Sequence, residues 1–371
     1  MIGRPTVQAP GKHLPTCRIL FVAPPVGPIG SGEAGGVETH LLNLAPILVG
    51  RGHSIGIVAP AGSVVPIPGV KLYQAAGKAS PSATRADRKA RTVVRTAGVL
   101  ETMWDQALRL QRQYDVVIGV NYDWLAFYLT PFFSTPVGHW ITICSAVDEV
   151  DRIVEKRWRE GRLHLAMYTG AQARTYPFLP SDRVHLLYGG VDPAVFQFNS
   201  EPQNRLCWAA RISPEKGLED AIAVARALDM PLDVCGKIQD QAYWDWATGN
   251  ASGAQIEYHG FLPPAELQRR YAAARATLVT PHWTEAFGNT VVESLACGTP
   301  VVAYGNGGPA EIIEHGRSGI LVPQADIPAL IEGVREAVNL DRRVARARAE
   351  EFSFARMADR FEAWIQFIRA S

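Results

Sequence analysis

The stretch RILFVAPPVGPIGSGEAGGVETHLLNLAPILVGRGHSIGIVAP, residues 18–60, decides the fold class of this chain. Residues 18–23 are a short apolar run that ends at two prolines, and residues 54–59 are a second run that Pro60 stops. Between them, residues 37–49 carry apolar side chains at the spacing of a helix. The order strand, glycine-rich loop, helix and strand predicts the opening of a doubly wound parallel sheet.

The same alternation continues along the chain and predicts two such sheets. Further strands are expected at residues 115–120, 137–143 and 184–188, then at 206–209, 232–235, 255–258, 277–280 and 300–303. Helices are expected at 218–228, 265–274, 290–296 and 327–337. The expected division is a flexible tail over 1–16, a first domain over 17–198, a linker over 199–204, a second domain over 205–350 and a helix within 351–371 that packs back across the domains. We therefore expect two Rossmann-like α/β domains facing a ligand-binding cleft.

Composition excludes several classes of function. The 371 residues carry 37 Lys and Arg against 36 Asp and Glu, a balance that argues against a general nucleic-acid binder. The sequence has no apolar stretch of the ~18 residues that a membrane-spanning helix needs, and residues 1–16 lack the apolar segment of a signal peptide. Five singly spaced cysteines favour a reduced, cytoplasmic protein. Basic clusters at 85–95 and 342–348 are interpreted as solvated helix faces rather than membrane attachment sites.

Two cations follow the first strand of the second half. Arg211 and Lys216 lie in ARISPEKG, residues 210–217, where Pro214 and Gly217 predict a turn that holds both near one point. Two cations this close suit a diphosphate, whose charge is spread over many oxygens. A surface turn with two solvated cations is the alternative.

The block PHWTEAFGNTVVESLACGTP, residues 281–300, predicts a ligand site at the start of a helix. The helix is expected to begin at Gly288 or Asn289, whose side chain can cap it. Free backbone N–H groups and the helix dipole there would attract an anion. Glu285 and Glu293 lie eight residues apart, and Glu293 alone would be interpreted as an exposed helical residue. The block as a whole favours a polyhydroxylated ligand with a phosphate.

The glycine-rich stretch 27–36 could cradle a phosphate or let an acceptor approach. A dinucleotide-binding fingerprint is the competing interpretation, and it needs an acidic residue at the end of the second strand. That strand ends Val58-Ala59-Pro60, which argues against a nicotinamide cofactor.

Taken together, these motifs resemble those of the retaining GT-B glycosyltransferases of family 4. The resemblance covers about residues 17–368 and rests on Arg211 with Lys216-Gly217, on the Glu285-to-Glu293 spacing, and on GGPAE at 307–311 with Gly316 and Gly319. In the first half, GGVE at 35–38 and Gly52-His53 agree with the family's opening motif. The resemblance implies a GT-B architecture and transfer of a hexose from a nucleotide sugar with retention at the anomeric carbon.

The resemblance also implies site residues in the second half. Arg211 and Lys216 would hold the donor diphosphate, Glu293 the ribose, and Glu285 the transferred sugar. The remaining donor-site residues that it implies are Gly35, Gly36, His259, Gly260, Phe261, Phe287, Gly288, Asn289 and Thr290. No metal is expected, because the two cations and the helix start would do its work and the sequence has no Asp-x-Asp triplet. The UDP-sugar is a co-substrate, and no cofactor is expected.

The acceptor side departs from the family. Thr142 stands where many relatives have a catalytic histidine, and His139 lies three residues earlier. His139 and Asp123 are therefore the candidates for catalytic contact with the acceptor, although a buried structural histidine is an equal alternative for His139. Gly32, Tyr122 and Trp124 complete the expected acceptor site.

A narrower resemblance concerns residues 25–32, 59–64 and 122–133, which look like those of bacterial UDP-glucose:tetrahydrobiopterin glucosyltransferases. It implies a glucose donor and a reduced pterin as the small-molecule acceptor. The alternatives are a family-4 transferase with a lipid or sugar acceptor, a UDP-GlcNAc 2-epimerase, and a non-catalytic nucleotide-sugar binder.

Overall fold

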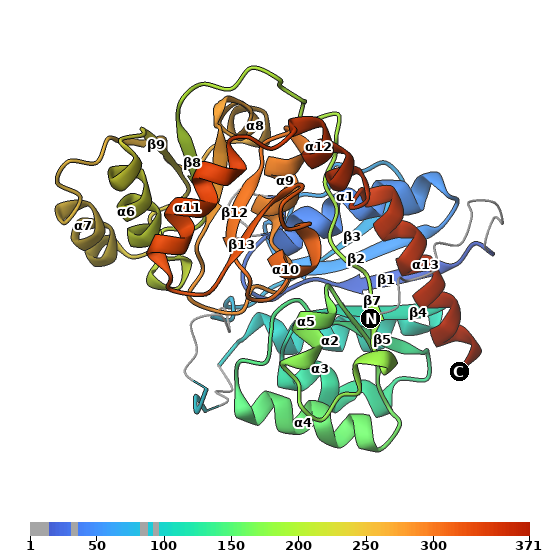
Figure 1. Ribbon diagram of the computed structural model, residues 1–371. Coiled ribbons are helices and arrows are strands. Elements are labelled where there is room, and N and C mark those ends of the chain that lie inside the picture. Colours follow the sequence, from blue (N-terminus) through green and yellow to red (C-terminus); the bar gives the residue numbers. More distant parts are fainter. Residues whose placement is uncertain (1–14, 31–35, 82–87, 92–95) are drawn as a thin grey trace.

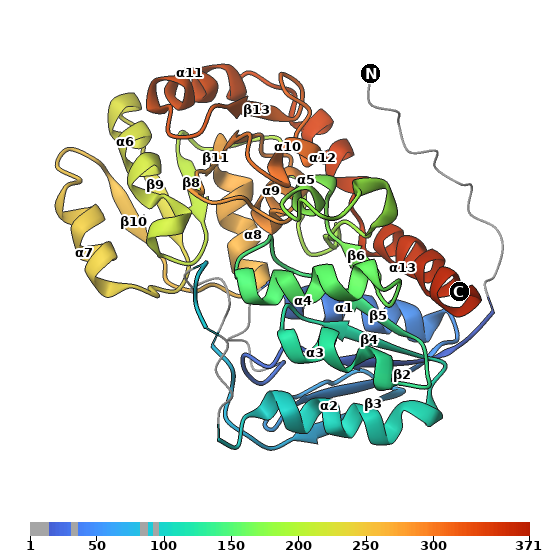
Figure 2. The same ribbon diagram turned by 90° about the horizontal axis from the view of Figure 1, so that it is seen from below.

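The computed structural model describes residues 15–30, 36–81, 88–91 and 96–371, and these residues form two α/β domains (Figure 1). Each domain is built on one parallel sheet, so the expectation of two Rossmann-like domains is confirmed. Figure 2 shows α1 and α13 above the first sheet and α2 below it. Most of the expected tail over 1–16 lies outside the described residues.

The first sheet has the strand order β3-β2-β1-β4-β5-β6-β7. Its strands are β1 Arg18–Val22, β2 Ser54–Pro60, β3 Val70–Ala75, β4 Val116–Val120, β5 Val137–Trp140, β6 His164–Met167 and β7 His185–Leu186. Its helices are α1 Gly36–Gly50, α2 Val99–Leu110, α3 Trp124–Leu129, α4 Asp148–Arg159 and α5 Gly170–Arg174.

The second sheet has the strand order β10-β9-β8-β11-β12-β13. Its strands are β8 Leu206–Ala209, β9 Leu232–Cys235, β10 Ile256–Tyr258, β11 Ala276–Val279, β12 Val301–Tyr304 and β13 Gly319–Val322. The helices are α6 Leu218–Leu228, α7 Gln241–Gly249, α8 Pro264–Ala273, α9 Asn289–Ala296, α10 Pro309–Ile312, α11 Ile327–Ala337, α12 Arg342–Glu350 and α13 Phe354–Ala370.

The two strand orders place a crevice at matching points of the two sheets. The winding reverses between β1 and β4 in the first sheet and between β8 and β11 in the second. At such a reversal the loops leave the carboxyl ends of neighbouring strands in opposite directions and open a ligand-binding crevice. The central strands form a rigid base for these loops, since residues 19–22 and 116–118 are at most 1% exposed.

The strands that sequence patterns failed to predict lie toward the sheet edges or are short. The edge strand β3 is only partly buried. Lys71 and Gln74 interrupt its apolar residues, so it has no continuous apolar run. The strands β6 and β13 have four residues each and lie next to or at an edge of their sheets.

The last helix, α13, lies on the first domain although it follows the second one in sequence. It packs against α1, β4, β5 and β7, and Figures 1 and 2 both show it next to the first domain. Its Glu362 carboxylate lies 2.6 Å from Nη1 of Arg51 and 2.9 Å from Nε2 of His53. The backbone N–H of Cys17 donates to Nδ1 of His53 at 3.1 Å. The Gly52-His53 motif therefore links α13 to the first strand.

The basic cluster at 342–348 is not a solvated helix face, and that expectation is corrected. Arg342 donates to the carbonyl oxygens of Asn199 and Ala274 at 2.7 and 3.0 Å. Arg346 donates to the Ala296 carbonyl at 2.6 Å, and Arg348 donates to the carbonyls of Glu311 and Ile312 in α10. Three of the four arginines of α12, Arg342, Arg346 and Arg348, therefore satisfy backbone oxygens and fix the helix there, whereas Arg343 is exposed.

The buried polar contacts of Glu362 should contribute measurably to stability. Glu362→Ala removes the acceptor of the buried His53 ring and of the partly buried Arg51 guanidinium, so we expect the free energy of unfolding to fall by about 2 kcal/mol. Glu350→Ala is the control, because its ion pair with Arg346 is on the surface, with 58% of the Glu350 side chain exposed, and should contribute less than about 1 kcal/mol. Urea denaturation followed by tryptophan fluorescence measures both, and equal losses would contradict the role given to Glu362.

Candidate functional site

The crevices of the two sheets join in one cleft of about 940 Å³. The first domain lines it with residues that follow β1, β4 and β5, namely 24–29, 121–123 and 142–146, and with the start of α1. The second domain lines it with residues 208–211 at β8 and 278–281 at β11, with Lys216, and with residues 283–290. Both walls therefore come from the strand ends at which the winding reverses.

The two predicted cations reach this cleft together. Arg211 and Lys216 both line it, and a short 3₁₀ turn over Pro214–Lys216 positions the lysine. Nζ of Lys216 lies 2.7 and 2.8 Å from the two carboxylate oxygens of Glu285, and 4.7 Å from the centre of the Trp283 ring. The Arg211 guanidinium donates to the amide oxygen of Gln239 at 2.9 Å.

The amino end of α9 points into the same cleft. Gly288 precedes the helix with φ of 106°, a conformation that favours glycine, and no side chain caps the helix. The expected cap by Asn289 is therefore wrong. Asn289 instead faces the first domain, where a Cβ added at Gly36 would lie 2.2 Å from its Nδ2 atom. The uncapped N–H groups and the helix dipole favour an anion at this point.

Glu285 is fixed by its backbone as well as by Lys216. Its carbonyl oxygen accepts from the N–H of Gly308 at 2.7 Å, and the indole N–H of Trp283 donates to its carboxylate at 3.1 Å. The GGPAE motif therefore supports the loop that carries Glu285.

The GGPAE motif also joins the two domains. The Glu311 carboxylate accepts from the backbone N–H groups of Gly170 and Ala171 at 3.1 and 2.6 Å. The Thr169 hydroxyl donates to the carbonyl of Ala286 at 2.8 Å. These bonds hold the loop before α9 against the first domain and set the width of the cleft.

The first-domain wall contains part of the predicted acceptor site. Tyr122 and Asp123 line the cleft, and burial raises the pKa of Asp123 to about 6. Trp124 is not among the lining residues and packs beside Tyr128 on α3, so its contact with an acceptor stays a prediction. Gly32 and Gly35 lie outside the described residues, whereas Gly36 lines the cleft.

His139 does not reach the cleft, and its assignment as an acceptor-contacting residue is corrected. It is fully buried in β5, with its ring 4.7 Å from that of Phe127 and its Nε2 atom 2.7 Å from the Thr130 hydroxyl. Burial lowers its pKa to about 3, so the ring is neutral at physiological pH. Successive side chains of a strand point to opposite faces of the sheet, and that of His139 points away from the cleft. His139 is therefore a structural histidine.

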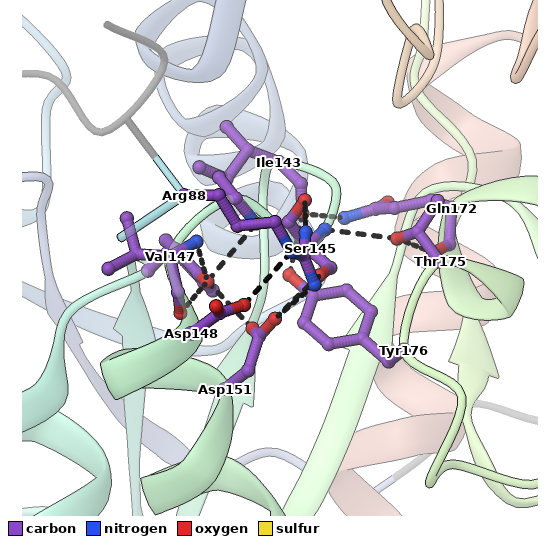
Figure 3. Close-up of polar contacts among 11 residues, drawn as sticks. Arg88, Ile143, Ser145, Val147, Asp148, Asp151, Gln172, Thr175 and Tyr176 are labelled. Carbon is purple, nitrogen blue, oxygen red and sulfur yellow. Dashed lines mark hydrogen bonds and ion pairs between the residues drawn. The ribbon is translucent and has the colours of Figure 1, made fainter. Parts of the chain in front are cut away.

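A polar network that the sequence did not reveal shapes the acceptor wall (Figure 3). Nε of Arg88 lies 2.9 Å from the Asp148 carboxylate, and the Asp151 carboxylate accepts from Tyr122 at 2.7 Å and from Ser145. Three further residues of Figure 3 hold the loop of residues 143–145. Gln172 and Tyr176 donate to the Ile143 carbonyl, and the Thr175 hydroxyl accepts from the backbone N–H of Ser145. Their partners are mostly backbone atoms of a loop, and neither spacing nor periodicity in the sequence signals such contacts.

Several residues implied for the nucleotide lie outside the cleft lining. His259 contacts Asp233 at 2.6 Å, Gly260 follows it in the same loop, and Phe261 is 61% exposed. Glu293 lies in α9, where the Tyr271 hydroxyl donates to it at 3.2 Å. Burial raises the pKa of Glu293 to about 7.

One cluster has the composition of a metal site. Ligand atoms of Asp233, Glu257 and His259 lie within 4.8 Å of one another. Arg205 already pairs with both carboxylates, at 3.2 Å from Asp233 and 2.7 Å from Glu257, so an arginine holds the position that a cation would take. Among the described residues, no helix has the length and apolar character needed to span a membrane.

Comparisons with known proteins agree with this geometry. Residues 193–352 match the family model described as "Glycosyl transferases group 1". A D-inositol 3-phosphate glycosyltransferase of Mycolicibacterium smegmatis is 26% identical over 90% of this chain and 87% of its own length. An alpha-maltose-1-phosphate synthase of the same species is 31% identical over 50% of this chain and 57% of its own.

Solved structures share the fold over nearly the whole chain. The sucrose-phosphate synthase of Thermosynechococcus elongatus superimposes with a TM-score of 0.76 at 16% identity, covering 95% of this chain and 100% of that one. Anabaena HepE in complex with UDP-glucose gives a TM-score of 0.71 at 16% identity, covering 96% and 100%. The comparisons support a glycosyltransferase with the GT-B fold, as the sequence motifs predicted.

Protonation of Glu293 should make stability depend on pH. Its pKa is raised from 4.5 to about 7 in the folded state, so the folded protein holds this proton more tightly than the unfolded chain. The wild type should therefore lose stability relative to Glu293→Gln as the pH rises from about 4.5 to about 7, and no further above that. Thermal melting of both proteins at about pH 5 and pH 8 tests this, with Glu350→Gln as the control, and a constant difference would contradict it.

Proposed function

We propose that the protein transfers a hexose, glucose in the first instance, from a UDP-sugar to a hydroxyl group of a small acceptor, with retention at the anomeric carbon. The observation that carries the proposal is the meeting of Arg211, Lys216 and the uncapped start of α9 on one wall of a cleft whose other wall belongs to the first domain. This is the arrangement that a nucleotide diphosphate needs, because its charge requires several aimed donors.

The donor side would work by electrostatic preorganisation. In the proposed complex the diphosphate lies between Lys216, Arg211 and the first N–H groups of α9, and stabilisation of its growing negative charge lowers the barrier to loss of the sugar. The donor must compete with Glu285 for Lys216, since the two side chains form an ion pair. Glu285 is then free to accept from hydroxyl groups of the transferred sugar.

The chemical step is a front-face substitution. The bond between the anomeric carbon and the diphosphate breaks, the acceptor oxygen bonds to that carbon on the same face, and the leaving diphosphate takes the hydroxyl proton. Asp123 at the acceptor wall would orient the hydroxyl. We also propose that Glu293 binds the ribose and that the backbone at residues 259–261 contacts the base. His259, Gly260, Phe261 and Glu293 lie outside the cleft lining.

The first-domain wall favours an uncharged acceptor. Among the described residues of that wall, Arg88 carries the permanent positive charge, and it is already paired with Asp148 and Asp151. His40 also lines the cleft, but burial lowers its pKa to about 3 and keeps it neutral. The relatives named above have phosphorylated sugars or inositols in their names, which gives no support for a pterin. The charge pattern nevertheless favours a neutral ring with hydroxyl groups, and a reduced pterin is the acceptor that we propose.

An acceptor panel tests this proposal. UDP-glucose is incubated with tetrahydrobiopterin, with D-myo-inositol 3-phosphate or with no acceptor, UDP release is measured, and the anomeric configuration of any product is determined by NMR. We expect release with the pterin, little with the inositol phosphate, and an α-linked product. Release that needs no acceptor would favour hydrolysis or epimerisation instead, and a β-linked product would contradict retention.

Removal of Lys216 should impair turnover without unfolding the chain. We expect Lys216→Ala to lower kcat by about 10²–10³-fold, because one aimed contact with the leaving group is lost. The matched control is Lys71→Ala on the exposed part of the edge strand β3, which should leave kcat unchanged. Near-wild-type turnover in Lys216→Ala with an unchanged melting temperature would refute the role of the lysine.

A further inference from the structure

Trp283 lines the cleft beside the two charged side chains of the proposed donor site. It is partly buried and lies in the segment that joins β11 to α9, two residues before Glu285. Its indole N–H donates to the Glu285 carboxylate at 3.1 Å. The Nζ atom of Lys216 lies 4.7 Å from the centre of its ring. One side chain therefore contacts both members of the ion pair.

The two contacts use different parts of the indole. The ring nitrogen is a hydrogen-bond donor and suits a carboxylate, whereas the face of the ring is negative and attracts an ammonium group. Tryptophan is the aromatic side chain that binds a cation best in this way. The side chains of Lys216 and Glu285 are only 14% and 15% exposed, so water competes little with either contact.

The backbone fixes the tryptophan relative to the lysine. The N–H of His282 donates at 2.9 Å to the carbonyl of Glu215, the residue that precedes the lysine. The carbonyl of His282 accepts from the side-chain amide of Gln324 at 2.8 Å. On the other side of the tryptophan, the Thr284 hydroxyl donates to the amide oxygen of Asn306 at 3.1 Å. The segment is therefore held on both sides of the indole, and one of these bonds joins it to the turn that carries the cation.

We propose that Trp283 is a positioning residue that couples recognition of the donor diphosphate to recognition of the donor sugar. This inference rests on the proposed function, and it deepens that function by naming the group that aims Lys216 and Glu285. When a diphosphate competes for the lysine, the carboxylate loses its cationic partner. The indole N–H then holds the carboxylate toward the sugar hydroxyls, and the ring face keeps the ammonium group at the diphosphate.

The two contacts can be removed separately. Trp283→Phe keeps a ring face and deletes the N–H, so we expect the Kd for UDP-glucose to rise about tenfold because a hydrogen bond to a charged group is lost. The Kd for UDP, which has no sugar for Glu285 to bind, should not change. Trp283→Leu deletes both contacts and should also raise the Kd for UDP, by about threefold or more. Calorimetry measures both ligands.

A double-mutant cycle separates positioning from packing. The N–H acts through Glu285, so in the Glu285→Ala background Trp283→Phe should change the Kd for UDP-glucose by less than about twofold. The ring face acts through Lys216, so Trp283→Leu should change the Kd for UDP equally little in the Lys216→Ala background. A residue that only packed would cause the same loss in every background, and that result would overturn the proposal. If Trp283→Leu does not fold, the cycle with Trp283→Phe decides alone.

The control is a tryptophan of the same domain that lies outside the cleft lining. Trp246 in α7 is 54% exposed, and Trp246→Phe and Trp246→Leu should leave both Kd values unchanged. Wild type that binds UDP and UDP-glucose while Trp283→Phe binds both equally well would overturn the role of Trp283 alone. Wild type that binds neither ligand would overturn the proposed function and this inference with it.

Discussion

The ion pair between Lys216 and Glu285 is the contact around which the cleft is organised. It brings a turn after β8 to the loop before α9, two segments that are 69 residues apart in sequence. Because Glu285 is also bound through its carbonyl to Gly308, the lysine is held at a fixed place relative to the helix start. A cation and a helix dipole that are aimed in advance at one point need little reorganisation when charge develops there. The pairing also keeps the cation neutralised by a group that an anionic ligand can replace.

The second constraint is the attachment of the two domains to each other. Glu311 of the second domain accepts from the backbone at the start of α5 in the first domain, and α13 returns to the first domain, where Glu362 contacts Arg51 and His53. The Glu311 contact lies close to the loop that carries Glu285. The Glu362 contact lies at the start of β2, which is the amino end of the strand and not the end that faces the cleft. The donor wall and the acceptor wall are therefore held in register by polar bonds whose breakage or formation can accompany movement of the domains.

Prediction from sequence succeeded where backbone regularity or a short local motif carried the information. The β-loop-α-β opening is local and periodic, and the cations of residues 210–217 lie beside a strand whose apolar run is unmistakable. Prediction failed where the orientation of one side chain decided the outcome. His139 and Thr142 lie three residues apart around the end of β5, and a strand turns alternate side chains to opposite faces, so only coordinates separate the buried ring from the cleft.

The central claim is that Arg211, Lys216 and the start of α9 together bind a nucleotide diphosphate. A crystal structure of the protein with UDP tests this most directly. The account predicts diphosphate oxygens within hydrogen-bond distance of both cationic side chains and of the backbone N–H groups that follow Gly288, with the Lys216–Glu285 pair loosened. A nucleotide bound elsewhere, or a diphosphate that touches neither cation, would contradict it.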